Sequence, residues 1–314
     1  MISVGRVYTA AARTDDVSPD LRTYLDSPLS DPPDFATSTI AEVRESFVRM
    51  RETSDLPDVA QVVDDSFAGP HGNVAVRIYR ASLDDAAPAL VWFHGGGWVL
   101  GDLDTAELPA RSLCLLTGCT VISVDYRMAP EDPFPAAAID SIAALDWVRS
   151  EHQALRVDPN RVIVSGDSAG GNLAAVAALD ARDRGLALAG QLLVYPVADS
   201  NLETTSCIEV GEGYGLTTAG MGWFWDQYVP DPEDRADWRA APLRANHADL
   251  CPGLVMTCGF DPLASEGLAY AASMSEAGCD VEVEHYPGGI HGMFTMALPS
   301  GAVARQRAAD WINA

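Results

Sequence analysis

One short segment of strand–turn–helix character restricts the possible folds of this chain more than any other. Residues 161–173 read RVIVSGDSAGGNL, in which an apolar run ends at Gly166 and an alanine-rich stretch begins after Ser168. Gly166 to Gly170 match the pattern G-x-S-x-G of a nucleophile elbow. We expect both glycines because so tight a turn has no room for a Cβ on either side of the serine. A serine that caps a helix after a buried strand has the same appearance, so a second motif has to decide.

The second motif is the glycine loop His94-Gly95-Gly96-Gly97-Trp98, which directly follows the apolar run 89–93. Three consecutive glycines expose backbone N–H groups that can surround a small anion. In α/β-hydrolases an H-G-G-G loop lies beside the elbow and supplies oxyanion donors. Glycine loops that serve only flexibility also exist. Both motifs follow strands here, in the expected order, and together they favour a nucleophilic serine at Ser168.

With these motifs in place, the chain resembles the hormone-sensitive-lipase-like family of bacterial esterases. The resemblance runs from about residue 60 to the C-terminus, more weakly through the N-terminal helices, and rests on five segments: His94–Trp98, Asp125–Glu131, Gly166–Asn172, Phe260–Leu263 and Ile290–Gly292. It implies the α/β-hydrolase fold, with a mostly parallel sheet of about eight strands and helices on both faces. We expect a single domain, 1–314, in which residues 1–55 and about 199–240 form a helical cap.

The residue pattern independently predicts alternating strands and helices. A β-hairpin is expected over 59–80, and two short amphipathic helices precede it, beginning after Ser18 and Thr39. Later strands are expected at 89–93, 119–125, 161–165, 191–195, 253–258 and 280–286, with helices near 105–117, 136–151, 169–184, 263–277 and 302–313. This βαβα order predicts a mostly parallel sheet covered on both faces.

Composition limits the function classes. The formal charge is −25, and every basic residue other than histidine is arginine. Such a surface argues against nucleic acid or anionic membrane as a partner. No secretory signal and no apolar run of about 20 residues is visible, so we expect a cytoplasmic protein with six free thiols. We find no pattern for a metal or cofactor, and expect neither. A homodimer is possible.

Six histidines and two aspartates compete for the remaining catalytic roles. His291 lies in a glycine-rich loop after the last strand, whereas His94 belongs to the glycine loop. The others are assigned elsewhere: His71 to a solvated turn, His285 to a strand, and His152 (at a helix end) and His247 to exposed positions. Asp199 and Asp261 both satisfy the chain order Ser, Asp, His. The family pattern Phe-Asp-Pro-Leu selects Asp261.

The expected reaction is hydrolysis of a small carboxylic ester with a short acyl chain, through an acyl-enzyme. Ser168 attacks, His291 transfers the proton and Asp261 orients the imidazole. The oxyanion donors are expected to be Ala169 with, by the family pattern, Gly96 and Gly97. Substrate contacts are expected at Trp98, Trp223 and Phe224, although the aromatic cluster at 223–228 fits a core equally well. An amidase or peptidase, or a receptor without catalysis, remains an alternative.

Overall fold

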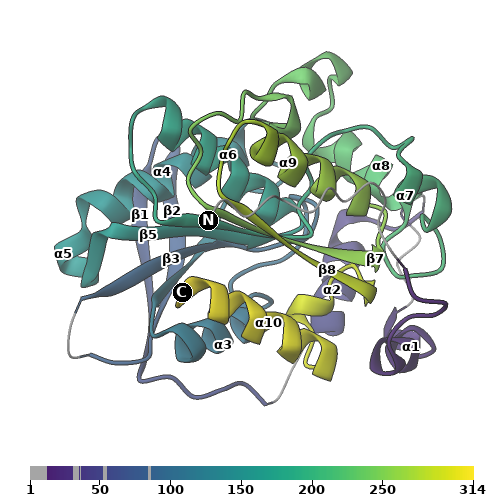
Figure 1. Cartoon of the computed structure of the whole chain (residues 1–314), viewed down its shortest axis with the longest axis horizontal. Helices are drawn as coiled ribbons and strands as arrows, with labels where there is room; N and C mark the ends of the chain where they lie inside the picture. The colour runs from purple at the N-terminus through teal and green to yellow at the C-terminus, as the bar shows by residue number, and fades with distance from the viewer. Residues whose placement is uncertain (1–12, 31–34, 36, 52–54, 84–85) are drawn as a thin grey trace.

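The structure, a computed structural model, describes residues 13–30, 35, 37–51, 55–83 and 86–314. Its centre is a sheet of eight strands in the order β1-β2-β4-β3-β5-β6-β7-β8 (Figure 1). The strands are β1 (Gln61–Gly69), β2 (Gly72–Arg80), β3 (Ala87–Phe93), β4 (Thr120–Asp125), β5 (Val157–Asp167), β6 (Gly190–Val194), β7 (Gly253–Phe260) and β8 (Val281–Ile290). Strand β2 pairs antiparallel with both of its neighbours, and all other neighbouring pairs are parallel. The predicted mostly parallel sheet is confirmed.

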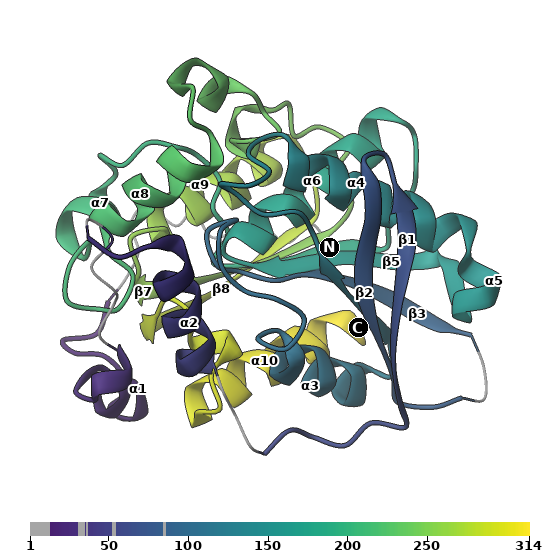
Figure 2. The ribbon, with the colours of Figure 1, turned by 180° about the vertical axis from the view of Figure 1, so that it is seen from behind.

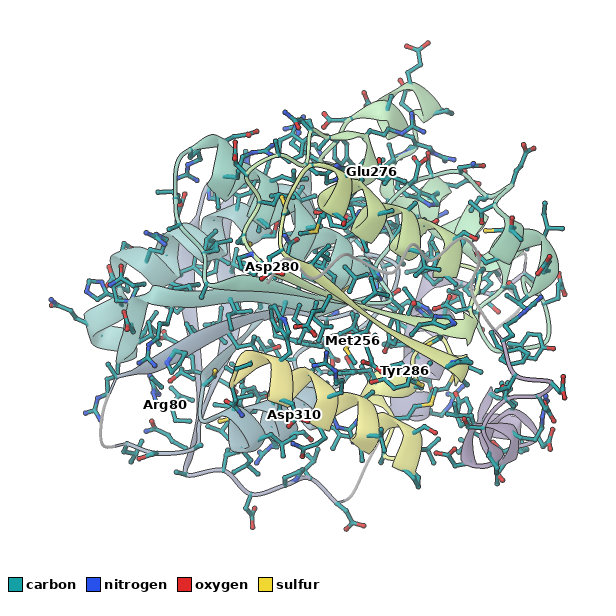
Figure 3. The ribbon with its side chains drawn as sticks, viewed as in Figure 1. Arg80, Met256, Glu276, Asp280, Tyr286 and Asp310 are labelled. Atoms are coloured by element: carbon teal, nitrogen blue, oxygen red, sulfur yellow. The ribbon has the colours of Figure 1, made fainter. Side chains whose placement is uncertain are left out.

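Helices cover both faces of this sheet. On one face lie α4 (Ala136–Ser150), α6 (Ala169–Asp183) and α9 (Ala264–Glu276); on the other lie α3 (Glu107–Thr117) and α10 (Pro299–Ile312) (Figure 2). Two separate clusters of buried apolar side chains fill the two layers. Met256 lies between the sheet and α10, whereas Glu276 and Asp310 face solvent from the outer sides of their helices (Figure 3). Strands covered on both faces read as continuous apolar runs, as β3 and β7 do.

Four helices lie toward the end of the sheet where β7 and β8 finish (Figure 1). They are α1 (Pro19–Leu25), α2 (Ile40–Arg51), α7 (Thr205–Glu209) and α8 (Thr218–Tyr228). The short helix α5 (His152–Leu155) lies at the opposite end of the sheet, and single turns occur at Pro28–Ser30, Pro232–Ala236, Pro242–Arg244 and Met293–Thr295. The expected capping box is present at α2: Thr39 N donates to Glu42 Oε2 at 2.8 Å, and Glu42 N donates to Thr39 Oγ1 at 3.3 Å. No helix among the described residues has both the length and the apolarity to cross a bilayer.

The largest differences from the predicted boundaries occur in two strands. Strand β5 begins at Val157 rather than 161, and β8 continues to Ile290 instead of ending at 286. The glycines before His291 therefore remain extended beside β7, across a register shift between Cys258 and Phe260. The shift accommodates two additional residues in β8 without ending the strand, and local composition does not reveal it.

Candidate active site

The elbow has the geometry that its two glycines require. Ser168 stands between β5 and α6 with φ 57° and ψ −119°, a conformation rarely adopted by residues with a side chain. A Cβ on Gly166 would lie 2.4 Å from the carbonyl of Gly170, and one on Gly170 would lie 1.9 Å from Phe93 O. Both contacts are impossible, so the turn depends on glycine at both positions.

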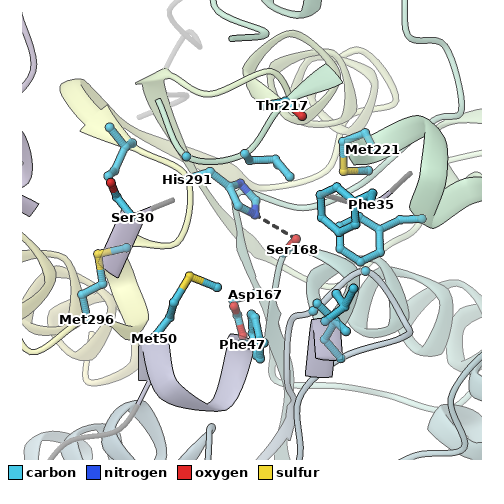
Figure 4. A pocket seen from close by; sticks show the side chains of 18 of the residues that line it. Ser30, Phe35, Phe47, Met50, Asp167, Ser168, Thr217, Met221, His291 and Met296 are labelled. Carbon is cyan, nitrogen blue, oxygen red and sulfur yellow. Dashed lines mark hydrogen bonds between the residues drawn. The ribbon is translucent and has the colours of Figure 1, made fainter. Parts of the chain in front are cut away.

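Three side chains from the carboxyl ends of three strands meet at this elbow. His291 Nε2 lies 2.9 Å from Ser168 Oγ (Figure 4), and His291 Nδ1 lies 2.9 Å from Asp261 Oδ2. Asp261 is fully buried, and its second oxygen accepts a 2.9 Å hydrogen bond from Leu263 N. The imidazole also packs against the Tyr195 ring, with 4.6 Å between ring centroids. The arrangement is a continuous hydrogen-bonded chain from a buried carboxyl to a hydroxyl.

The glycine loop lies directly beside Ser168. Gly96 and Gly97 have φ values of 120° and 61°, and both residues line the same cavity as Ser168. Gly95 N donates a 2.9 Å hydrogen bond to Asp167 Oδ1, so the residue before the serine ties the loop to the elbow. A Cβ on Gly97 would lie 2.2 Å from the Phe224 ring. The loop is therefore held from both sides, with its backbone facing the cavity.

Two further features complete this part of the site. His94 is buried behind the loop, stacked on Tyr126 with 4.4 Å between centroids, and its Nδ1 lies 2.8 Å from Gly95 O. Ala169 is the first residue of α6. Its N–H belongs to the first helical turn, where backbone donors have no intrahelical acceptor. A donor of this kind next to Ser168 is available to an anion.

The cavity above Ser168 has mostly apolar walls built from distant parts of the chain. Phe35 and Met221 lie on one side of the serine, and Met50 and Met296 lie on the other (Figure 4). Phe224 also lines the cavity. The remaining described wall residues include Tyr24, Ser30, Val43, Phe47, Leu100, Leu216, Thr217 and Ile290. N-terminal and C-terminal segments thus enclose an elbow that comes from the middle of the chain.

Of the three expected substrate contacts, Phe224 lines the cavity and two do not. Trp98 is completely buried, with its ring stacked on Tyr228 at 4.2 Å between centroids. Trp223 lies behind the wall, 4.9 Å from the Phe35 ring. On α8, Met221 and Phe224 stand three residues apart on one face and line the cavity, whereas the adjacent Trp223 points to another side of the helix.

The other candidates for the catalytic acid and base lie away from Ser168. Asp199 bonds to Arg244 at 2.8 Å and not to a histidine. His285 Nδ1 lies 2.8 Å from Thr257 Oγ1 in the paired strands, and His71 is exposed at the hairpin turn, as expected. The expectation of exposure was wrong for His247, which is 3% exposed.

His247 packs against α9. Its Nδ1 lies 3.0 Å from Ser273 Oγ and its ring meets Tyr270 edge-on, and burial lowers the pKa of the imidazole. Exposure was wrong for His152 as well: it is half-buried and begins the four-residue helix α5 (His152–Leu155) rather than ending one. The polar neighbours of both histidines misled the prediction because burial here depends on distant segments.

Several wall residues were not predicted from the sequence. Ser30, Phe35, Leu216 and Met296 lie outside the regular helices and strands, so no periodicity marks them. Val43, Phe47 and Met50 did carry a signal, because they repeat along one face of α2 at helical spacing. That face contributes to the wall.

Comparison with known proteins agrees with this geometry. A family model described as an alpha/beta hydrolase fold matches residues 90–295. The chain is 36% identical over 304 residues to the carboxylesterase NlhH of Mycobacterium tuberculosis, covering 93% of this chain and 94% of that protein. It is 36% identical over 262 residues to an ethyl acetate hydrolase of Pseudomonas putida, covering 81% and 82% of the two chains.

Comparison with solved structures also finds esterases. A hyperthermophilic esterase from the archaeon Pyrobaculum calidifontis has a TM-score of 0.91 and 37% identity, covering 95% of this chain and 98% of that one. The family resemblance drawn from the five sequence motifs is confirmed. The protein is a serine carboxylesterase, and it belongs to the hormone-sensitive-lipase-like esterases of the α/β-hydrolase fold.

Proposed function

We propose that Ser168, His291 and Asp261 hydrolyse short-chain carboxylic esters at this site. The observation that carries the proposal is the chain of two 2.9 Å contacts from Asp261 through His291 to Ser168, which ends in an apolar cavity. Ser168 Oγ attacks the ester carbonyl while His291 Nε2 accepts its proton. The imidazolium then donates that proton to the departing alcohol, and water repeats the sequence to release the acid.

The oxyanion of each tetrahedral intermediate needs donors that are in place before it forms. We assign this role to the backbone N–H groups of Gly96, Gly97 and Ala169, because Gly96 and Gly97 line the same cavity as Ser168 and Ala169 follows the serine directly. They come from a loop anchored to Asp167 and from the first turn of a buried helix, so little reorganisation accompanies the reaction. Each such donor contributes about a hundred- to a thousandfold in rate in comparable hydrolases.

We also propose that residues 1–55 and about 199–240 act as a cap over the site. Val43 and Phe47 of α2 and Met221 and Phe224 of α8 line the same cavity, which supports this assignment. A wall made of side chains from both segments gives the cavity a finite depth. The relative named as an ethyl acetate hydrolase acts on a small ester, which supports a short-chain substrate.

The depth of the cavity predicts a maximum in the acyl-chain profile. Each additional methylene contributes about 0.8 kcal/mol while there is apolar wall to cover it. Beyond that depth the chain stays in water or displaces α2, so kcat/KM should rise from acetyl esters and then fall well before palmitoyl. Initial rates on a series of p-nitrophenyl esters measure this. A profile that peaks at palmitoyl would contradict the short-chain assignment.

The same series, run beside matched anilides, tests the reaction class. Amides have a poorer leaving group, and the structure shows no feature that would compensate within the described residues. We therefore expect ester hydrolysis to exceed anilide hydrolysis by several orders of magnitude. Comparable rates on both would favour an amidase. A cleaved ester also excludes a receptor that binds without catalysis.

Removing residues 1–50 tests the cap. The deletion takes away α1 and nearly all of α2, so it exposes cavity residues from other segments, such as Phe224 and Met296. We expect a loss of at least tenfold in kcat/KM together with lower solubility, because water enters the site and apolar surface is uncovered. A truncated protein with full activity and solubility would show that this segment does not cap the site.

Two assignments concern the protein as a whole. We infer a cytoplasmic location, supported by six cysteines that are all free. We infer a homodimer, supported by the position of β8 at an edge of the sheet, because an edge strand can pair with a strand of a second copy. Cell fractionation and light scattering of the purified protein test the two inferences.

A further inference from the structure

A fully buried carboxyl lies close to the proposed triad without belonging to it. Glu266 stands in the first turn of α9 and is 2% exposed. Burial raises the pKa of this carboxyl well above its usual range. Hydrogen bonds from the backbone of Ala198 and Asp199 lower it, and the nearby carboxylates of Asp199 and Asp261 raise it again. A buried acid beside two other acids is costly, so its role requires an explanation.

The carboxyl links α9 to a different part of the chain. Glu266 Oε1 accepts a 2.8 Å hydrogen bond from the backbone N–H of Ala198. Ala198 belongs to residues 195–199, the segment that directly follows β6, which we call the β6 strut. An acid in the first turn of a helix interacts favourably with the helix dipole, but that effect does not require the side chain to reach another segment. Glu266 acts as a cross-link.

The β6 strut contacts both the nucleophile and the base. Val197 N donates to Ser168 O at 3.2 Å, and the Tyr195 ring packs 4.6 Å from the imidazole of His291. Asn172 Nδ2 of α6 donates to Val197 O at 3.0 Å. Tyr195 has φ 36°, a conformation that persists in a tyrosine only where surrounding contacts hold it. A displacement of this strut would therefore shift both Ser168 and His291.

At its other end, the cross-link starts from α9, which continues directly from the turn that carries Asp261. Leu263 N donates to Asp261 Oδ1 at 2.9 Å, Ala264 N donates to Asp261 O at 3.1 Å, and α9 continues directly to Glu266. The turn and the strut are in close contact, because a Cβ on Gly267 would lie 3.6 Å from Pro196 Cδ. The acid-bearing turn thus has a fixed spacing from the strut.

We propose that Glu266 is a positioning residue, whose carboxyl holds the β6 strut against the acid-bearing turn and so keeps Ser168, His291 and Asp261 aligned for proton transfer. This inference rests on the triad assignment proposed above. The side chain does not touch the reacting atoms. Its effect comes through alignment, and a misplacement of about 1 Å in such a site costs up to about a hundredfold in rate.

Two substitutions of Glu266 separate alignment from general stability. Glu266→Ala leaves the Ala198 N–H buried without its acceptor, and we expect kcat to fall about thirty- to a hundredfold with KM within about threefold of wild type. Glu266→Gln retains an oxygen at the same reach, and we expect it to restore kcat to within about threefold. Kinetics on p-nitrophenyl butyrate and the Tm of each full-length variant are the measurements.

Met274→Ala is the matched control. Met274 is completely buried two turns further along α9, where a Cβ on Gly253 at the start of β7 would lie 3.1 Å from Met274 Cε. Its truncation should lower Tm while kcat stays within about twofold. If Glu266→Ala does not fold, Glu266→Asp gives the same test, because it keeps the acid but withdraws the oxygen by one methylene. We expect about a tenfold loss of kcat from that variant.

Three results would overturn the inference. The first is a kcat for Glu266→Ala within threefold of wild type, and the second is a loss of kcat in Glu266→Gln as large as that in Glu266→Ala. The third is a loss of kcat in Met274→Ala that stands in the same ratio to its fall in Tm as in Glu266→Ala. Ser168→Ala, assayed in parallel, distinguishes a failure of the Glu266 inference from a failure of the triad assignment. An active Ser168→Ala would reject the triad itself. An inactive Ser168→Ala beside an unimpaired Glu266→Ala would reject the role of Glu266 alone.

Discussion

Replacement of Ser168 by alanine is expected to reduce ester hydrolysis by about a million-fold, the loss seen when a serine triad loses its nucleophile. That factor corresponds to about 8 kcal/mol in activation free energy. Without Oγ no acyl-enzyme forms, and water must attack the bound ester directly. The glycine loop and the cavity remain, so a small residual rate should persist. Single-turnover and steady-state kinetics with p-nitrophenyl butyrate measure the loss.

The folded state should be almost unaffected by this substitution. Ser168 Oγ contacts His291 Nε2, whereas the backbone of the elbow is held separately, by the bond from Ser168 N to Val194 O at 2.9 Å. Alanine adopts the elbow conformation no less readily than serine, so we expect Tm within a few degrees of wild type. Turnover within tenfold of wild type would place the nucleophile elsewhere in the chain.

Asp261→Asn is expected to lower kcat by about ten-thousandfold, as in the serine-protease precedent. Asp261 Oδ1 accepts from Leu263 N, and Oδ2 faces His291 Nδ1. If the asparagine oxygen stays on Leu263, its NH₂ group faces Nδ1 and forces the ring proton onto Nε2. The base can then no longer accept the serine proton. The reversed amide orientation sets two donors against each other at Leu263.

Asp199→Asn is the matched control for this substitution. Asp199 bonds to Arg244 at 2.8 Å and to the backbone N–H of Ser200, and it does not contact His291. A partly exposed ion pair of this kind contributes about 1 kcal/mol or less, so kcat should stay within about threefold. Equal losses from the two variants, or a larger loss at Asp199, would refute the assignment of the acid.

How much of this could be predicted from the sequence depends on how local the cause is. The elbow was predictable because much of its cause is local: a Cβ on Gly166 would lie 2.4 Å from the carbonyl of Gly170, four residues along the chain. The alternation of strands and helices was predictable for a similar reason, since each element carries its own periodicity. The order of the motifs then placed His291 at the same edge of the sheet.

Features that depend on contacts between distant segments could not be predicted from the local sequence. His247 is buried by Tyr270 and Ser273, which follow it by more than 20 residues in another helix. Whether Trp98 or Phe224 reaches the cavity depends on how α8 rotates against the glycine loop, and both are large aromatic residues. Glu266 was missed because its sequence context is that of an ordinary helical first turn, and its partner Ala198 has no distinctive side chain.

The segment around α1 is bonded to residues that follow it by about 270 to 280 positions in the sequence. Ser18 N donates to Gly288 O at 2.8 Å, and Asp20 accepts two bonds from Ser300 at 2.8 Å each, across 280 residues of sequence. Contacts of such separation form late, because the loop must close before they contribute. On the ribosome, residues 13–30 therefore emerge before residues 287–300 and have no docking surface until those residues have followed. We expect a nascent chain arrested before His291 to lack esterase activity even with the elbow fully made.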